Sequence, residues 1–264
     1  MEMNYVKLGQ GRPLLLLHGL GGTWRSWIPI MGRLAMNREV IAVDLPGFGA
    51  TPPLIEKVSI ETLADAITDF ISAHHLRGVD VVGSSMGGRL ALELARRGGN
   101  VVGAVVALAP GGFRSPKLRH IFYSLMVLSR HFARVLQPIL PLMTRNVLGR
   151  TILFAPFSMR PWKLPPEIAL GEIQHYAASK SFNEIVYDMA YGSPQQGAPK
   201  NSIPNQLVIA WGEWDLICFP QQAKRAIELF PDASLEWFQK VGHFPHWDIP
   251  EQTAELILLH TTHK

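Results

Sequence analysis

Hydrophobic and polar positions follow two different periods through the first part of the chain. Short, mostly apolar runs that end in a glycine turn occur at PLLLLHG (13–19), EVIAVDLPGFG (39–49) and VVGAVVALAPGG (101–112). Such runs are typical of strands that are buried on both faces of a sheet. Residues 59–75 instead place apolar side chains at helical spacing after Ser59, a favourable N-cap residue. This alternation predicts a mostly parallel sheet covered by helices.

The alternation stops in the middle of the chain and later resumes. Residues 113–199 contain no good run for a parallel strand, and their apolar and basic stretches are compatible with helices broken by prolines. The strand pattern returns in NQLVIAWGEWD (205–215) and ASLEWFQKVGH (233–243). We therefore predict a doubly wound α/β domain, made of residues 1–112 and 200–264, with a helical insertion at 113–199.

The positive charge of the chain lies in this insertion. Residues 113–199 hold 10 Lys and Arg against 4 Asp and Glu, whereas the rest of the chain holds 15 against 17. A solvated basic surface is the simplest interpretation, and attraction to an anionic substrate, an acyl carrier or a membrane surface is the alternative. No nucleic-acid motif accompanies the charge, so we expect no nucleic-acid partner.

The bulk composition narrows the class of protein. The N-terminal residues MEMNYVKLGQGRP lack the features of a signal peptide, and no apolar run reaches about 18 residues, so we expect a cytoplasmic protein without stable membrane insertion. The single cysteine, Cys218, excludes an intrachain disulfide and a cysteine-based metal site. We expect it to serve as a small apolar residue.

The stretch DVVGSSMGGRLALELA (80–95) places two serines between a predicted strand and a predicted helix. A sharp strand-to-helix turn that exposes a serine hydroxyl requires small residues two positions before and after that serine. Ser85 has glycines at both positions, whereas Ser84 has Val82 and Met86 there. Ser85 is therefore the candidate nucleophile, and the free N–H groups of the helix favour negative charge beside it.

A serine hydroxyl needs a base to take its proton and an acid to orient that base. His243 follows a predicted strand in KVGHFPHWDIPE and is the candidate base, and His246 is the alternative in the same loop. Asp215 ends the run LVIAWGEWD and lies between the serine and the histidine in the chain, so it is the candidate acid. Glu213 is the alternative acid.

Two backbone amides are the candidate donors to an oxyanion. The N–H of Met86 directly follows the nucleophile, and the N–H of Leu20 lies in the glycine-rich turn of LLLLHGLGGTW. We expect the side chains of Leu20, Met86 and Phe244 to line the substrate pocket. The glycine-rich turn lacks the spacing of a P-loop or a dinucleotide fingerprint, and we predict no cofactor and no metal.

Five motifs resemble those of the α/β-hydrolase fold superfamily and occur in the same order. They are HGLGG (18–22), DLPGFGAT (44–51), GSSMGG (83–88), WGEWD (211–215) and GHFPHWDIPE (242–251). The resemblance is to the serine-nucleophile, esterase-like branch, and it implies that Ser85, Asp215 and His243 act as nucleophile, acid and base. It also implies that the helical insertion follows strand 6 as a cap over the active site. Dehalogenases and epoxide hydrolases of the superfamily use aspartate as the nucleophile, so the serine argues against both.

These observations predict a serine hydrolase that cleaves small carboxylic esters, with short to medium acyl or aryl groups, through an acyl-enzyme. A carbon–carbon bond or lactone hydrolase with the same three residues is the alternative among enzymes. A ligand-binding receptor that uses the pocket under the cap is the alternative outside enzymes.

Overall fold

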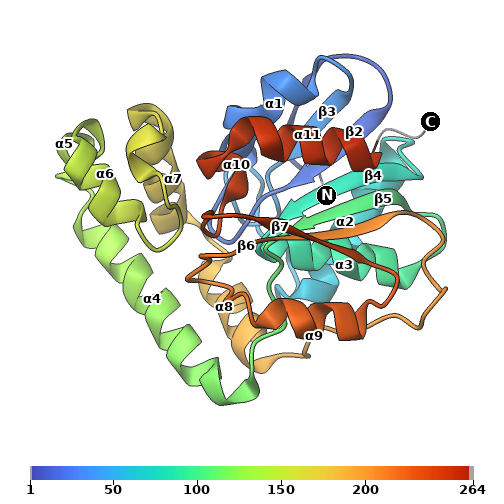
Figure 1. Ribbon diagram of the computed structural model, residues 1–264. Helices are drawn as coiled ribbons and strands as arrows, with labels where there is room; N and C mark the ends of the chain where they lie inside the picture. Colours follow the sequence, from blue (N-terminus) through green and yellow to red (C-terminus); the bar gives the residue numbers. More distant parts are fainter. Residues whose placement is uncertain (1, 262–264) are drawn as a thin grey trace.

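Seven strands form one sheet in the order β1-β3-β2-β4-β5-β6-β7 in the computed structural model, which describes residues 2–261 (Figure 1). β1 runs antiparallel to β3, and the neighbouring pairs from β3 to β7 are parallel. The strands are β1 (Tyr5–Leu8), β2 (Pro13–Leu17), β3 (Glu39–Val43), β4 (Val79–Ser84), β5 (Val102–Leu108), β6 (Leu207–Gly212) and β7 (Ser234–Phe238). The predicted, mostly parallel α/β sheet is confirmed.

Helices cover both faces of this sheet. Leu14 and Leu16 of β2 pack with residues of α1 and α11 on one face, and Leu15 and Leu17 pack with residues of α2, α3 and α9 on the other. Consecutive side chains of a strand point to opposite faces, which explains why these strands are apolar throughout. The helices are α1 (Ile28–Leu34), α2 (Ile60–Ala73), α3 (Met86–Arg97), α4 (Arg119–Val135), α5 (Leu140–Arg145), α6 (Val147–Phe154), α7 (Pro166–Ala178), α8 (Phe182–Tyr191), α9 (Gln222–Leu229), α10 (Pro245–Asp248) and α11 (Pro250–Thr261).

Residues 113–199, called the insertion below, follow β5 and contain helices α4 to α8 but no strand. In Figure 1, α4 to α7 form a group beside the sheet, coloured green to yellow. The prediction that strand 6 precedes the insertion is wrong, because within the described residues five strands come before it. Residues 2–12 form one short strand, β1, which is too short to show a period in the sequence. None of the helices in residues 2–261 combines the length and apolar character needed to cross a lipid bilayer.

A buried ion pair joins several elements at the amino ends of the strands. Arg38, just before β3, donates from Nη2 to Oδ2 of Asp80 on β4 at 2.7 Å, and both side chains are almost fully buried. The other carboxylate oxygen of Asp80 accepts the N–H of Ala104 on β5 at 2.8 Å. Arg38 also donates from Nη1 to the carbonyl oxygen of Thr261 at the end of α11, at 2.7 Å. The pair thus links three strands and the last helix.

Replacing Arg38 with Leu is expected to lower the free energy of unfolding by about 3–5 kcal/mol, because Asp80 then stays buried with less compensating charge. Arg33→Leu is the matched control. The Arg33 guanidinium lies 3.5 Å from the carboxylate of Glu255 on the surface, and the loss of such a pair costs about 1 kcal/mol or less. Urea unfolding followed by circular dichroism measures both losses, and equal losses would contradict the role given to Arg38.

Candidate active site

Ser85 alone makes the turn between β4, which ends at Ser84, and α3, which begins at Met86. Its φ of +56° and ψ of −112° lie in a region that residues other than glycine rarely adopt, at a cost of about 1–3 kcal/mol. Hydrogen bonds hold this conformation. The Ser85 N–H donates to Leu108 O at 2.9 Å, and Ser85 O accepts from the N–H groups of Arg89 and Gly111 at 3.0 and 3.1 Å.

The glycines on either side of Ser85 allow the backbone to approach closely. A Cβ atom on Gly83 would lie 2.0 Å from Gly87 O, and a Cβ atom on Gly87 would lie 2.1 Å from Leu17 O. Both contacts are with backbone atoms, which cannot move aside easily. The steric requirement for small residues is therefore met at Ser85. The neighbouring Ser84 has a buried Oγ with no hydrogen-bond partner among the described residues.

The structure brings His243 and Asp215 together. His243 follows β7 and Asp215 follows β6, and the Nδ1–H of the imidazole donates to Asp215 Oδ2 at 2.8 Å. The other oxygen of Asp215 accepts the N–H groups of Ile217 and Cys218 at 2.8 and 2.9 Å. The alternative acid, Glu213, is exposed and accepts from the N–H of Lys240 instead. The geometry therefore favours Asp215 as the group that orients the imidazole.

His246, the alternative base, lies against Trp27 with the ring centroids 4.7 Å apart. It is buried, its Nδ1 has no hydrogen-bond partner among the described residues, and burial lowers its pKa to about 3. The ring is therefore neutral at pH 7, and no hydrogen bond links it to Asp215. Its contacts are those of a side chain that packs the loop.

The sequence did not predict a role for Asp248, a buried residue at the end of α10. Its Oδ2 accepts the N–H of Gly242 at 2.8 Å and that of Met159 at 3.0 Å, and its Oδ1 accepts the N–H of Arg160 at 3.1 Å. Ser158 Oγ also donates to Oδ1. One carboxylate thus fixes the residue next to His243 to the insertion.

The turn after β2 lies directly beside Ser85. A Cβ atom on Gly19 would lie 3.4 Å from Ser85 Cβ. His18 holds this turn, since its Nδ1–H donates to Gly19 O at 2.7 Å and its Nε2 accepts the N–H of Leu45 at 2.9 Å. Burial lowers the pKa of His18 to about 4, so the ring is neutral at pH 7. Within the described residues, the amides of Leu20 and Met86 donate no hydrogen bond, and both remain available to a ligand.

Two adjoining cavities lie at this end of the sheet. A small one, of about 40 Å³, is lined by residues that include Ser85, His243 and Leu20. A larger one, of about 540 Å³, is walled mostly by apolar side chains of the turn after β2 and of α4, α6 and α7, and its volume is typical of ligand pockets. The residues that line both are Leu20, Met126, Phe157, Tyr176, Ile217 and Phe244. Among residues 2–261, no group of three His, Cys, Asp or Glu side chains is arranged to hold a metal ion.

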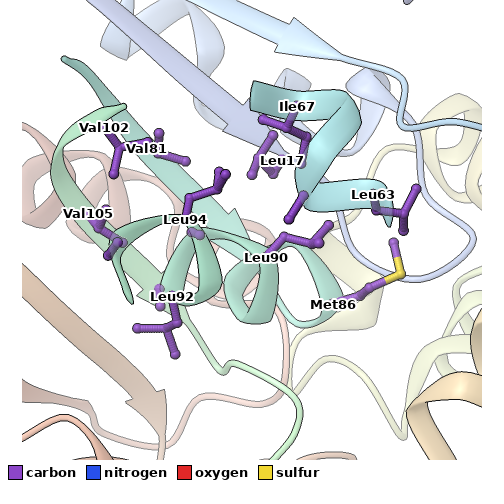
Figure 2. Close-up of a cluster of buried hydrophobic side chains, with 14 of the residues drawn as sticks. Leu17, Leu63, Ile67, Val81, Met86, Leu90, Leu92, Leu94, Val102 and Val105 are labelled. Atoms are coloured by element: carbon purple, nitrogen blue, oxygen red, sulfur yellow. The ribbon is translucent and has the colours of Figure 1, made fainter. Parts of the chain in front are cut away.

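Met86 is a correction to the predicted pocket. Leu20 and Phe244 line the cavities, but the Met86 side chain lines neither of the two. Figure 2 shows it beside Leu63 and Leu90 in the buried cluster between the sheet and the helices. The side chain of this first residue of α3 lies in the core, so only its backbone amide remains a candidate. Cys218 is buried in the same cluster, as predicted.

A buried carboxyl group lines the large cavity. Glu172 of α7 is almost fully buried, and its Oε1 accepts a hydrogen bond from Ser26 Oγ at 2.8 Å. Burial raises the pKa of Glu172 to about 7, and the hydrogen bond from Ser26 offsets only part of that effect. At neutral pH the cavity wall therefore carries a carboxyl group that is partly protonated.

Comparison with known proteins adds an independent line of observation. A family model described as "Alpha/beta hydrolase family" matches residues 14–256. An uncharacterized protein of Mycobacterium tuberculosis is 25% identical over 258 residues, which cover 94% of this chain and 75% of the relative. The 2-hydroxy-6-oxo-6-(2'-aminophenyl)hexa-2,4-dienoic acid hydrolase of Metapseudomonas resinovorans is 37% identical over 123 residues, 42% of this chain and 40% of the relative.

Among solved structures, a thermophilic esterase from Thermogutta terrifontis has a TM-score of 0.74 with this protein. The superposition covers 97% of this chain and 91% of that chain at 19% sequence identity. At this identity the likeness shows a shared fold.

Glu172→Gln is expected to gain stability relative to the unmodified protein as the pH rises. A carboxyl group whose pKa is raised from 4.5 to about 7 in the folded state contributes its full stability below pH 4.5 and loses it as the pH rises through 7. The glutamine amide does not titrate. The difference in unfolding free energy between the two proteins should therefore increase from pH 4.5 to 7 and level off above that range. Urea unfolding across this range measures it, and a constant difference would contradict a buried, protonated Glu172.

Proposed function

Because the chain belongs to the alpha/beta hydrolase family, we propose that it is a serine hydrolase that cleaves carboxylic esters through an acyl-enzyme. The observation that carries the proposal is the hydrogen bond between His243 and Asp215, beside a cavity that Ser85 also lines. A base that is oriented by a carboxylate and lies next to a serine is the arrangement needed to activate a hydroxyl group.

The proposed mechanism uses the second ring nitrogen of His243 and the backbone amides of Leu20 and Met86. Because the Nδ1–H of His243 donates to Asp215, Nε2 is the nitrogen that accepts the proton of Ser85 Oγ as this oxygen attacks the ester carbonyl. The amides of Leu20 and Met86 stabilise the oxyanion. The imidazolium then protonates the leaving alcohol, and a water molecule activated by the same Nε2 releases the acid and restores Ser85.

The walls of the large cavity favour an apolar substrate. They are mostly apolar, and they contain no Lys or Arg among the described residues. Since this cavity shares a wall with the small one, an ester carbonyl next to Ser85 can place its acyl or aryl group among these side chains. We propose short to medium acyl or aryl esters as substrates, and we propose that the insertion acts as the cap that closes over them.

A carbon–carbon bond hydrolase is the second candidate, and one residue favours it. Arg114 lines the small cavity together with Ser85 and His243. Burial lowers the pKa of its guanidinium, which remains charged at neutral pH, and it lies over the ring of Phe122 at 3.7 Å. A guanidinium in this position is suited to a substrate that carries a carboxylate near the reacting carbonyl. The name of the Metapseudomonas relative describes a substrate that carries a carboxylic acid at one end of a dienoic chain and an oxo group on its sixth carbon.

Assays with two kinds of substrate distinguish these candidates. Neutral nitrophenyl esters of short and medium acids are expected to give a kcat/KM at least about tenfold above that of a vinylogous diketone acid, because the large cavity offers apolar contact and no cation. Stopped-flow absorbance measures both rates on the same preparation. A preference for the diketone acid would replace the ester proposal with the second candidate.

Ser85→Ala is expected to lower kcat for ester hydrolysis by about 10⁶ and to abolish the burst of acyl-enzyme formation, since no other nucleophile replaces Oγ. The matched control is Ser84→Ala, which removes a buried hydroxyl group that has no hydrogen-bond partner in residues 2–261. This variant is expected to stay within about tenfold of the original kcat and to unfold at the same or a higher temperature. Activity lost in Ser84→Ala and kept in Ser85→Ala would assign the nucleophile to the other serine.

A further inference from the structure

The outer surface of the insertion is unusually apolar. Of the 23 exposed large hydrophobic side chains in residues 2–261, 12 lie between residues 118 and 152. Five of them form a stripe along α4, which we call the α4 apolar face: Ile121, Leu125, Leu128, Phe132 and Val135, each 49–60% exposed. Their spacing of four and three residues places them on one side of the helix. A contiguous exposed patch of this kind marks an interaction surface.

This face adjoins the mouth of the large cavity. Leu125 and Phe132 belong to the α4 apolar face and also line the cavity. Two more of the exposed large hydrophobic side chains also line the cavity, Ile152 of α6 (72% exposed) and Leu216 of the loop after β6 (55% exposed). The exposed rim of the cavity therefore carries these four large apolar side chains. A partner that covers the α4 apolar face lies against this rim.

The segment that carries this face has charges of one sign. Residues 113–166 contain nine Lys and Arg and no Asp or Glu. Arg130 and Arg150 are buried and donate to the carbonyl oxygens of Ser179 and Thr144, so they stabilise the helices. The exposed cations are Lys117, Arg119, Arg134, Arg145 and Lys163. Exposed apolar side chains among cations are suited to a surface whose interior is apolar and whose boundary is anionic.

We propose that the α4 apolar face and the exposed cations of residues 113–166 dock on a lipid bilayer that contains anionic phospholipids. The apolar side chains enter the boundary between headgroups and acyl chains, and the cations contact lipid phosphates. Docked in this way, the apolar rim of the cavity faces the lipid. A second copy of the chain is a poor occupant, because it would set cations against cations with no acidic residue in either segment.

Vesicle co-sedimentation tests the proposal without depending on the proposed hydrolysis. The protein and its Ser85→Ala variant are each mixed with vesicles of phosphatidylcholine alone or with added phosphatidylglycerol. Both proteins are expected to bind the anionic vesicles at least about tenfold more tightly than the neutral ones, and the binding is expected to weaken as salt is added. No binding to the anionic vesicles, or equal binding to both kinds, overturns the proposal.

Surface variants locate the contact. Leu128 and Val135 lie on the α4 apolar face and do not line the large cavity. Leu128→Ser with Val135→Ser is expected to weaken binding at least about tenfold. The control double variant, Met36→Ser with Leu259→Ser, alters two side chains outside the insertion that are each 72% exposed. It is expected to bind the anionic vesicles as tightly as the unmodified protein. Thermal unfolding verifies that all variants are folded.

A second pair of double variants tests the contribution of the positive charges. Arg145→Gln with Lys163→Gln is expected to weaken binding about tenfold or more, whereas Lys224→Gln with Arg225→Gln, on the exposed side of α9, leaves it unchanged. If the variants of the insertion and their controls lose vesicle binding to the same extent, the proposal is overturned. Sedimentation equilibrium provides a further check. If the protein is a dimer and the double variant Leu128→Ser with Val135→Ser is a monomer, this face is an interface between two copies of the chain. That result would also overturn the proposal.

Discussion

The close approach of backbone at the turn around Ser85 is the constraint on which the rest of the site depends. Because Gly87 has no Cβ, the start of α3 lies directly against Leu17 O at the end of β2. The turn that follows β2, with Gly19 and Leu20, is thereby held beside Ser85. One steric requirement thus places the proposed nucleophile, the start of a helix and a free amide of a second loop within the same small volume. The strained conformation of Ser85 is the cost of this arrangement.

The sequence predicts that the candidate site residues lie at one edge of the sheet, because parallel strands end at the same edge. The apolar runs identify β2, β4 and β6, and their following turns carry Leu20, Ser85 and Asp215. The sequence favours Asp215 over Glu213 as the acid but does not exclude Glu213, since both follow the same strand. It depends on side-chain direction, and the structure shows one carboxylate turned toward His243 and the other toward solvent.

Other features depend on contacts between parts of the chain that are far apart in the sequence, so no local sequence pattern predicts them. Ser158 donates a hydrogen bond to Asp248, which lies 90 positions away in the sequence, and Ser26 donates one to Glu172, which lies 146 positions away. The direction of the Met86 side chain was predicted wrongly for a related reason. A residue at the start of a helix has its amide on one side and its side chain on another, so a role for the amide implies nothing about the pocket. The sequence does not predict β1, because its four residues are too few to define a period.

Asp248 shows why the insertion and the proposed catalytic base belong to one structural unit. Its carboxylate accepts hydrogen bonds from Gly242, which precedes His243, and from Met159 and Arg160 of the insertion. A further hydrogen bond, from the N–H of Phe244 to Phe157 O at 3.1 Å, joins the same two segments. The side chains of Phe244 and Phe157 line both cavities. The wall that we propose contacts a substrate and the loop that carries the proposed base are therefore fixed to each other. A change in the insertion that displaces this wall also displaces His243, so the proposed mechanism couples the fit of a substrate to proton transfer.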